Sequence, residues 1–359
     1  MKRIHRFSAL LCALALLLGT PMAWGPSAAA VEAGDTITEG SYTAKVNDDG
    51  TGVILTGISS ALQERLVLPD SLGGLPVTEI AAGFFTGPGG YSMNTIVIPQ
   101  SVTAIAPTAF NGYRTKSVSA FETDPENTAF EAEDGVLFQR GDSGNTLVAY
   151  PQAKTDSHYT VPDGVSAIGG WAFYGAKNLA TLTLPDGLTS IGSNSFSSSG
   201  LTALSIPGTV TDIGEGVFSS CDSFSEITLA MKKIPDKLFY MSKGLVRVTL
   251  ADTVEEIGSN AFYNCDQLTA VEIPDSVKTI GRSAFYDCDQ LAGVKLGAGL
   301  TAIDSYAFYS CGALTEIDFP AALSTIGDHT FSSCGLTALA LPDGITAVQS
   351  EVFGGNAFT

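Results

Sequence analysis

Apolar and polar residues alternate along this chain in a unit that recurs at steps of 21 to 23 residues. Residues 179–199, LATLTLPDGLTSIGSNSFSSS, show the unit in full. LATLTLP predicts a short strand with Leu182 and Leu184 on one face, ended by Pro185 because a prolyl nitrogen cannot donate to a sheet ladder. Asp-Gly predicts a turn. LTSI then predicts a second short extended piece, and GSNSFSSS a tight helical turn that places Phe196 under the strand.

The phenylalanine of the last segment marks the repeat, and two strand positions form further columns. The markers are Phe173, Phe196, Phe218, Phe239, Phe262, Phe285, Phe308, Phe331 and Phe353. No single unit can bury its apolar face, so the units must stack and bury columns of like residues. The pattern predicts an elongated repeat solenoid with a parallel β-sheet face.

Two segments depart from the repeat. Residues 41–57, SYTAKVNDDGTGVILTG, alternate on both sides of NDDG and predict a β-hairpin, which we expect to cap the open end of the stack. Residues 114–160 interrupt the repeat, and strands at Val136–Gln139 and 146–150 predict an inserted hairpin. The expected organisation is an N-terminal cap over 31–63 and a solenoid over 64–359, with the insertion at about 114–160.

Residues 1–30 have the layout of a secretory signal peptide. Lys2, Arg3 and Arg6 form a cationic start, residues 7–18 an apolar run, and Ala28 and Ala30 an A-x-A cleavage site. The apolar run is too short to span a bilayer comfortably. We expect export, a mature chain starting near Val31, and no membrane insertion after cleavage.

The charge of the chain bears on its partners. The formal charge is −19, and it becomes −22 when the three cations of residues 1–30 are removed. Such an acidic protein should repel phosphate backbones and anionic lipid surfaces, so we expect neither nucleic acid nor membrane surfaces as partners.

The unit resembles the bacterial leucine-rich repeat of the BspA-like (treponemal) class. The resemblance is carried by LTAVEIPDSVKTIGRSAFYDC at 268–288 and LTALSIPGTVTDIGEGVFSSC at 201–221, and it extends over roughly residues 40–353. It implies a right-handed leucine-rich-repeat stack of about eleven units with short helical or 3-10 turns. It also implies a secreted or surface-exposed protein, often engaged in adhesion to host matrix proteins or other cells, without shared catalytic residues.

Five cysteines recur three residues after a phenylalanine marker: Cys221, Cys265, Cys288, Cys311 and Cys334. Other units carry Ala176, Ser199 or Ser242 there, so the position requires a small, buried side chain. Disulfides between adjacent coils are the alternative in an exported protein, but side chains that point the same way rarely give the torsion of a bridge. We interpret the cysteines as free, inert thiols.

Few other residues are candidates for catalysis or metal binding. Clustered Cys or His pairs for zinc are absent, and only His158 and His329 follow the predicted signal segment, so we expect no catalytic residues, no metal site and no cofactor. Acidic residues recur after Pro, as at Asp275, and after Cys, as at Asp266. Turn formation and capping explain them, and stacked carboxylates that bind Ca²⁺ remain the minor alternative.

The outward strand positions are therefore the predicted binding face. Its residues are Thr183, Ser205, Glu226, Thr228, Arg247, Thr249, Glu272, Lys295, Glu316 and Asp318. Solenoids commonly bind partners on such a face, although a merely solvated sheet would look the same. A second column, Tyr240, Tyr263, Tyr286 and Tyr309, is a secondary contact strip or a shield for the turn edge.

These features predict a non-enzymatic secreted or cell-surface protein that binds extracellular proteins or glycans. The alternative is a structural spacer within a larger extracellular protein.

Overall fold

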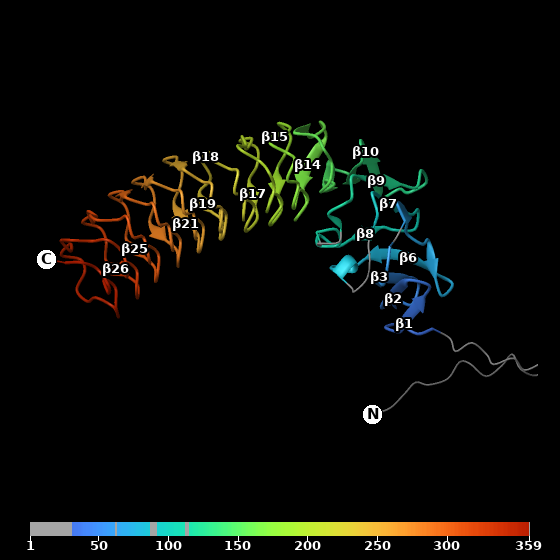
Figure 1. The fold of residues 1–359 in the computed structure, drawn as a ribbon, viewed down its shortest axis with the longest axis horizontal. Coiled ribbons are helices and arrows are strands. Elements are labelled where there is room, and N and C mark those ends of the chain that lie inside the picture. Colours follow the sequence, from blue (N-terminus) through green and yellow to red (C-terminus); the bar gives the residue numbers. More distant parts are fainter. Residues whose placement is uncertain (1–30, 62, 87–91, 112–114, 359) are drawn as a thin grey trace, which may run out of the picture.

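The computed structural model describes residues 31–61, 63–86, 92–111 and 115–358, which form an elongated arc of stacked coils (Figure 1). The predicted signal peptide, residues 1–30, lies outside the described residues. In the regular part of the arc each coil contributes one short strand to each of two parallel sheets, as β22 (Ala270–Glu272) and β23 (Thr279–Ile280) do. The predicted repeat solenoid is confirmed.

Antiparallel strands occupy the N-terminal end. Here β1 (Thr36–Glu39) and β2 (Tyr42–Val46) precede β3 (Val53–Ile58), which then pairs in parallel with β6 (Leu75–Ile80). The remaining strands here are β4 (Arg65–Val67), β5 (Ser71–Leu72), β7 (Thr95–Ile98), β8 (Ala104–Ile105) and β9 (Ala120–Thr123), with the 3-10 turn η1 (Phe84–Thr86). The hairpin predicted around NDDG is thus present, and its second strand leads into the stack.

The predicted inserted hairpin is also present. Strand β11 (Val136–Gln139) pairs antiparallel with β12 (Asn145–Ala149) and with β10 (Phe130–Glu133). Alternate side chains of the hairpin enter different cores: Leu137 and Ala149 pack with the N-terminal core, whereas Phe138 and Leu147 pack with the solenoid core. Strand β12 then pairs in parallel with β14 (Val165–Ile168), so the hairpin joins the two parts.

The regular coils supply the rest of the strands. One series is β13 (His158–Thr160), β15 (Thr181–Thr183), β18 (Glu226–Leu229), β20 (Arg247–Leu250), β22 and β24 (Gly293–Lys295). The other is β14, β16 (Ser190–Ile191), β17 (Asp212–Ile213), β19 (Lys233–Ile234), β21 (Glu256–Ile257), β23, β25 (Ala302–Ile303) and β26 (Thr325–Ile326). Both series are interrupted, between β15 and β18 and between β17 and β19.

The phenylalanine column forms the centre of the solenoid core. From Phe173 to Phe353 successive ring centroids lie 5.0 to 6.0 Å apart, and every ring from Phe173 to Phe331 is fully buried. Most neighbouring rings are nearly parallel, for example 7° between Phe285 and Phe308. Each ring therefore covers the face of the next, and recurrence in the sequence reflects contact in space.

The segments expected to be helical are runs of tight turns, with η1 the one helix among the described residues. In residues 192–199 the N–H of Ser195 and Ser197 closes a turn within the coil, whereas the N–H of Phe196 reaches the next coil, 3.0 Å from the Val217 carbonyl. A helix would direct every N–H along its own axis. Here alternate N–H groups point to the next coil instead. They form a third ladder of hydrogen bonds between coils, on the edge away from the two sheets.

Close approach of the coils also explains the glycine that follows the second strand. A Cβ on Gly281 would lie 2.8 Å from the backbone of Gly258, the equivalent residue one coil earlier. A side chain at this position would push the coils apart.

The cysteine column provides hydrogen-bond donors. Each thiol lies 3.0 to 3.2 Å from the carbonyl of the phenylalanine marker one coil earlier, as Cys288 does with Phe262. Ser242 and Asn356 occupy the same position in their coils and donate to the carbonyls of Phe218 and Phe331. The five thiols are buried and free, which confirms their interpretation as structural residues.

We expect Phe285→Ala to lower the free energy of unfolding by about 3–5 kcal/mol, because the surrounding rings cannot collapse into the space left. Denaturant unfolding of residues 31–359 measures the change. The exposed Thr249→Ala is the control, with an effect within about 0.5 kcal/mol. A loss below about 1 kcal/mol for Phe285→Ala would contradict the stacked core.

The buried thiols should make stability fall at alkaline pH. Burial raises the pKa of the Cys221 thiol to about 11 and the pKa of the Cys288 thiol to about 12, whereas an unfolded thiol ionises near about 8.5. The contribution is fully present below the unfolded pKa and is lost as the pH rises towards the folded pKa values. Its slope is up to about 1.4 kcal/mol per pH unit for each thiol.

The test compares the free energy of unfolding of the Cys221→Ser/Cys288→Ser variant with that of the natural chain from pH 8 to 11. Both proteins have the same tyrosines, so a difference between their slopes comes from the thiols. We expect the variant to lose less stability over this range. Equal slopes for the two proteins would show that the thiols are not protected by burial.

Candidate functional site

The regular part of the predicted binding face is the outward side of the β18–β20–β22–β24 sheet. Inward residues of these strands are buried or nearly so, and outward residues are exposed, as the alternation in Glu226–Leu229 shows. All ten residues predicted for this face are exposed. Six of them lie on strands of this sheet, namely Glu226, Thr228, Arg247, Thr249, Glu272 and Lys295.

Strand register brings the charged residues of the face into rows. Glu226 lies opposite Arg247, and the same row continues through Ala270 to Gly293. In the neighbouring row Glu272 lies opposite Lys295, with 3.8 Å between carboxylate oxygen and Nζ. Both side chains are more than three-quarters exposed, so this ion pair contributes little to stability and both groups remain accessible to a partner.

The face contains a hollow of about 320 Å³ over β22 and β24. Its floor holds the small residues Ala270, Ala292 and Gly293, and its walls hold Glu272, Lys295, Glu316 and Asp318. The sheet ends at β24 and residues 315–321 of the next coil carry no strand, so Glu316 and Asp318 line the hollow from outside the sheet. Carboxylates and an ammonium group around a shallow floor can hold a polar ligand by hydrogen bonds and charge.

The small floor residues were not among the predicted site residues. The sequence could have indicated them, because three outward positions of adjacent units lack a large side chain. His158 was also missed as an outward residue of the separate β13–β15 sheet. It lies on β13, opposite Thr181 in the register, with Nδ1 2.8 Å from the Thr181 hydroxyl oxygen.

Four predicted face residues lie outside this sheet, namely Thr183, Ser205, Glu316 and Asp318. Thr183 lies on β15, which pairs with β13 only, and Ser205 lies in a coil whose residues 203–207 form no strand. The predicted face is therefore divided, and only its part from Glu226 to Lys295 lies on strands of one sheet.

The predicted tyrosine column is a stacked strip at the turn edge. Ring centroids from Tyr240 through Tyr263 and Tyr286 to Tyr309 are 4.7 to 4.9 Å apart, and all four side chains are half-buried. Tyr306 and His329 extend the strip with rings 4.9 Å apart. Its role as a contact strip stays a prediction.

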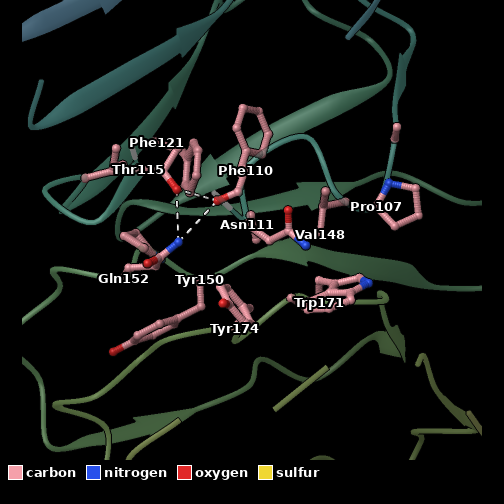
Figure 2. Close-up of a pocket in the computed structure, with 15 residues that line it drawn as sticks. Pro107, Phe110, Asn111, Thr115, Phe121, Val148, Tyr150, Gln152, Trp171 and Tyr174 are labelled. Atoms are coloured by element: carbon pink, nitrogen blue, oxygen red, sulfur yellow. Dashed lines mark hydrogen bonds between the residues drawn. The ribbon is translucent and has the colours of Figure 1, made fainter. Parts of the chain in front are cut away.

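A small cavity lies at the junction between the N-terminal part and the solenoid (Figure 2). The Gln152 side-chain amide donates to the Phe110 carbonyl at 3.3 Å and to the Thr115 hydroxyl at 2.9 Å. With about 20 Å³ of space the cavity has room for about one water molecule, so it is a packing feature and not a ligand site.

Groups that could perform chemistry are dispersed. Among the described residues no three His, Cys, Asp or Glu side chains converge as metal ligands. Asp266 and Asp287 share the side-chain amide of Asn264, which is ordinary turn stabilisation. Within the described ranges no helix has the length and apolar character needed to cross a bilayer.

Known proteins were compared with this chain in sequence and in structure. A search of curated proteins found no match. A leucine-rich repeat protein from Eubacterium ventriosum is similar in structure, with a TM-score of 0.52 and 22% identity over 85% of this chain and 96% of that protein. A leucine rich cell surface protein from Faecalibacterium prausnitzii is also similar, with a TM-score of 0.52 and 22% identity over 90% of this chain and 93% of that protein.

The pneumococcal vaccine antigen PcpA gives a TM-score of 0.58 at 18% identity, over 91% of this chain and 86% of that chain. At these identities the likeness shows the fold. The family itself is shown by the sequence, since the model of the BspA type leucine rich repeat region matches residues 152–233 and 232–359 in six copies. The chain therefore belongs to the BspA-type leucine-rich repeat family.

Proposed function

We propose that this chain is a secreted or cell-surface binding protein that holds extracellular proteins or glycans non-covalently on its β18–β24 sheet face. Such ligands would come from a host matrix or from other cells. The observation that carries the proposal is the hollow over β22 and β24, where small floor residues meet four charged side chains, two on the sheet and two in the following coil.

The relatives support a location outside the cell. One similar structure is described as a cell surface protein and another as a vaccine antigen. The layout of residues 1–30 as an export signal points the same way.

The placement of nucleophiles and bases supports a non-enzymatic role. The cysteines are buried and donate to carbonyl groups of the core. His158 contacts threonine hydroxyls on the exposed face, and His329 stacks on Tyr306. Neither histidine lies against a thiol that it could activate, as nucleophilic catalysis requires.

Charge reversal at the hollow tests the proposed site. The mature chain is first screened against purified extracellular matrix proteins and cell-wall glycans, and saturable binders are titrated. We expect Glu272→Lys/Asp318→Lys to weaken binding at least about tenfold, because two carboxylates at the rim become cations.

The matched control is Asp163→Lys/Asp252→Lys, which changes the net charge equally at two exposed turns away from the face. Normal binding by the rim variant, or equal losses in both variants, would contradict the site. If no ligand binds saturably, the alternative of a structural spacer is the better description.

Filling the hollow tests its shape separately from its charge. A Cβ at Gly293 would lie 3.3 Å from the Ala270 Cβ, a contact that a small shift relieves, and the Gly293 backbone is not left-handed. We expect Gly293→Val to change the free energy of unfolding by less than about 1 kcal/mol, since valine suits a strand. Ligand binding should fall at least about tenfold because valine occupies the floor. Binding that stays unchanged in a folded variant would place the ligand elsewhere.

A further inference from the structure

The solenoid is open between two neighbouring coils in its middle. Strands β17 and β19 occupy equivalent positions in consecutive coils, yet they belong to different sheets, and no backbone hydrogen bond joins them. The turn edges of the same coils remain connected, since the N–H of Gly216 donates to the Asp236 carbonyl at 3.0 Å. The coils are thus joined at the turn edge and separated at the sheet.

The sequence of the second coil explains the separation. In other coils the inner strand residue and the following isoleucine are seven positions apart, as Ile273 and Ile280 are, whereas Leu229 and Ile234 are five apart. The shortened turn draws the chain away from its neighbour. Pro235 also occupies the position at which most coils have glycine, and it has no N–H to donate to the Ile213 carbonyl.

The separation creates a cleft of about 740 Å³. Its apolar lining is Val210, Ile213 and Met231, all only half-buried. The equivalents of Val210 in other coils, such as Leu188 and Val277, are fully buried. The cleft therefore exposes core positions that every regular coil covers with the next strand.

The open edge of β17 presents unpaired acceptors. In the regular part of this series the N–H of Lys278 donates to the Glu255 carbonyl and that of Gly281 to the Ile257 carbonyl, both at 2.8 Å. The equivalent acceptors in the cleft are the carbonyls of Thr211 and Ile213, and no described residue donates to either. These acceptors specify an extended backbone as their partner, because a strand supplies N–H groups at this spacing.

Charge on the cleft is uneven. Lys232 and Lys233 are paired with Glu255 and Glu256 at 3.2 and 2.7 Å. Asp212 and Glu215, beside the open edge, form no ion pair with any described residue. The unneutralised charge of the cleft is negative and favours a basic residue in the occupant.

We propose that the β17–β19 cleft binds an extended segment of a partner polypeptide by strand addition to β17. The segment has two apolar residues three positions apart, which cover Val210 and Ile213, and a basic residue between them. This is the general mode in which main-chain hydrogen bonds hold a peptide at an open sheet edge and side-chain pockets select it. The cleft shares no residue with the hollow over β22 and β24, so this inference does not depend on the proposed function.

The chain's own repeat supplies the probe. Residues 274–281, PDSVKTIG, carry Val277, Lys278 and Ile280 in the required order and pair in this way with β21. A blocked synthetic peptide of this sequence is titrated into mature protein labelled with ¹³C on its methionine methyl groups. Met231 lies in the cleft, Met93 is buried elsewhere and Met241 is exposed on the turn edge, so each reports on a different place.

We expect a saturable shift of the Met231 methyl signal alone, at peptide concentrations up to the millimolar range. The matched control peptide has an N-methylated final glycine, which removes the N–H aimed at the Ile213 carbonyl. It should bind about fivefold more weakly, the effect of one hydrogen bond. The Glu272→Lys/Asp318→Lys protein should bind the first peptide normally.

Any of four outcomes would overturn the inference. The first three are no Met231 shift over this range, equal binding of the two peptides, and parallel shifts of all three methionines. Weak binding by the Glu272→Lys/Asp318→Lys protein would also contradict it, because the two surfaces would then not be separate.

Discussion

Backbone hydrogen bonding between successive coils is the constraint on which the rest of this structure depends. Each regular coil is paired with the next along two parallel sheets and along a third ladder formed by the turns. All three ladders must stay in register at once, so the repeat length can hardly vary. Side chains one repeat apart therefore lie over one another, and like residues gather into columns such as Phe262, Phe285 and Phe308.

The columns explain features that resemble chemistry in the sequence. A cysteine beside tyrosine and carboxylates, repeated every 23 residues, looks like a reactive motif until its surroundings are known. In the structure Cys288 donates to the Phe262 carbonyl, and Ser242 and Asn356 donate to the equivalent carbonyls in other coils. Two surfaces are not used by the ladders and are free to bind partners. One is the outward side of the β18–β24 sheet, and the other is the edge of β17, left open where the shortened turn before Pro235 prevents pairing.

Most of the fold could be predicted because it follows from periodicity. The core columns, the hairpin around NDDG and the strands of the inserted hairpin all come from local alternation of apolar and polar residues. The form of the turns could not be read in the same way, since residues such as GSNSFSSS suit a helical turn as well as a run of tight turns. Pairing with the next coil decides between them, and that is a property of the stack.

The candidate site was predicted in part. Outward positions such as Glu272 and Lys295 follow from strand alternation, whereas the hollow depends on where the sheet ends, at β24, and on small residues that draw no attention in a sequence. The β17–β19 cleft is visible in the sequence only as a two-residue deletion and a proline. Its depth and its unpaired carbonyls depend on how far the neighbouring coils separate.

Distances between spin labels on the outward column test the stacking most directly. With one label at Thr183 and the second at Thr228, Glu272 or Asp318, the labels are two, four and six coils apart. The structure predicts mean distances that grow by about 5 Å per coil, the spacing of neighbouring strands. Distances that do not increase with the number of repeats would contradict a solenoid built coil upon coil.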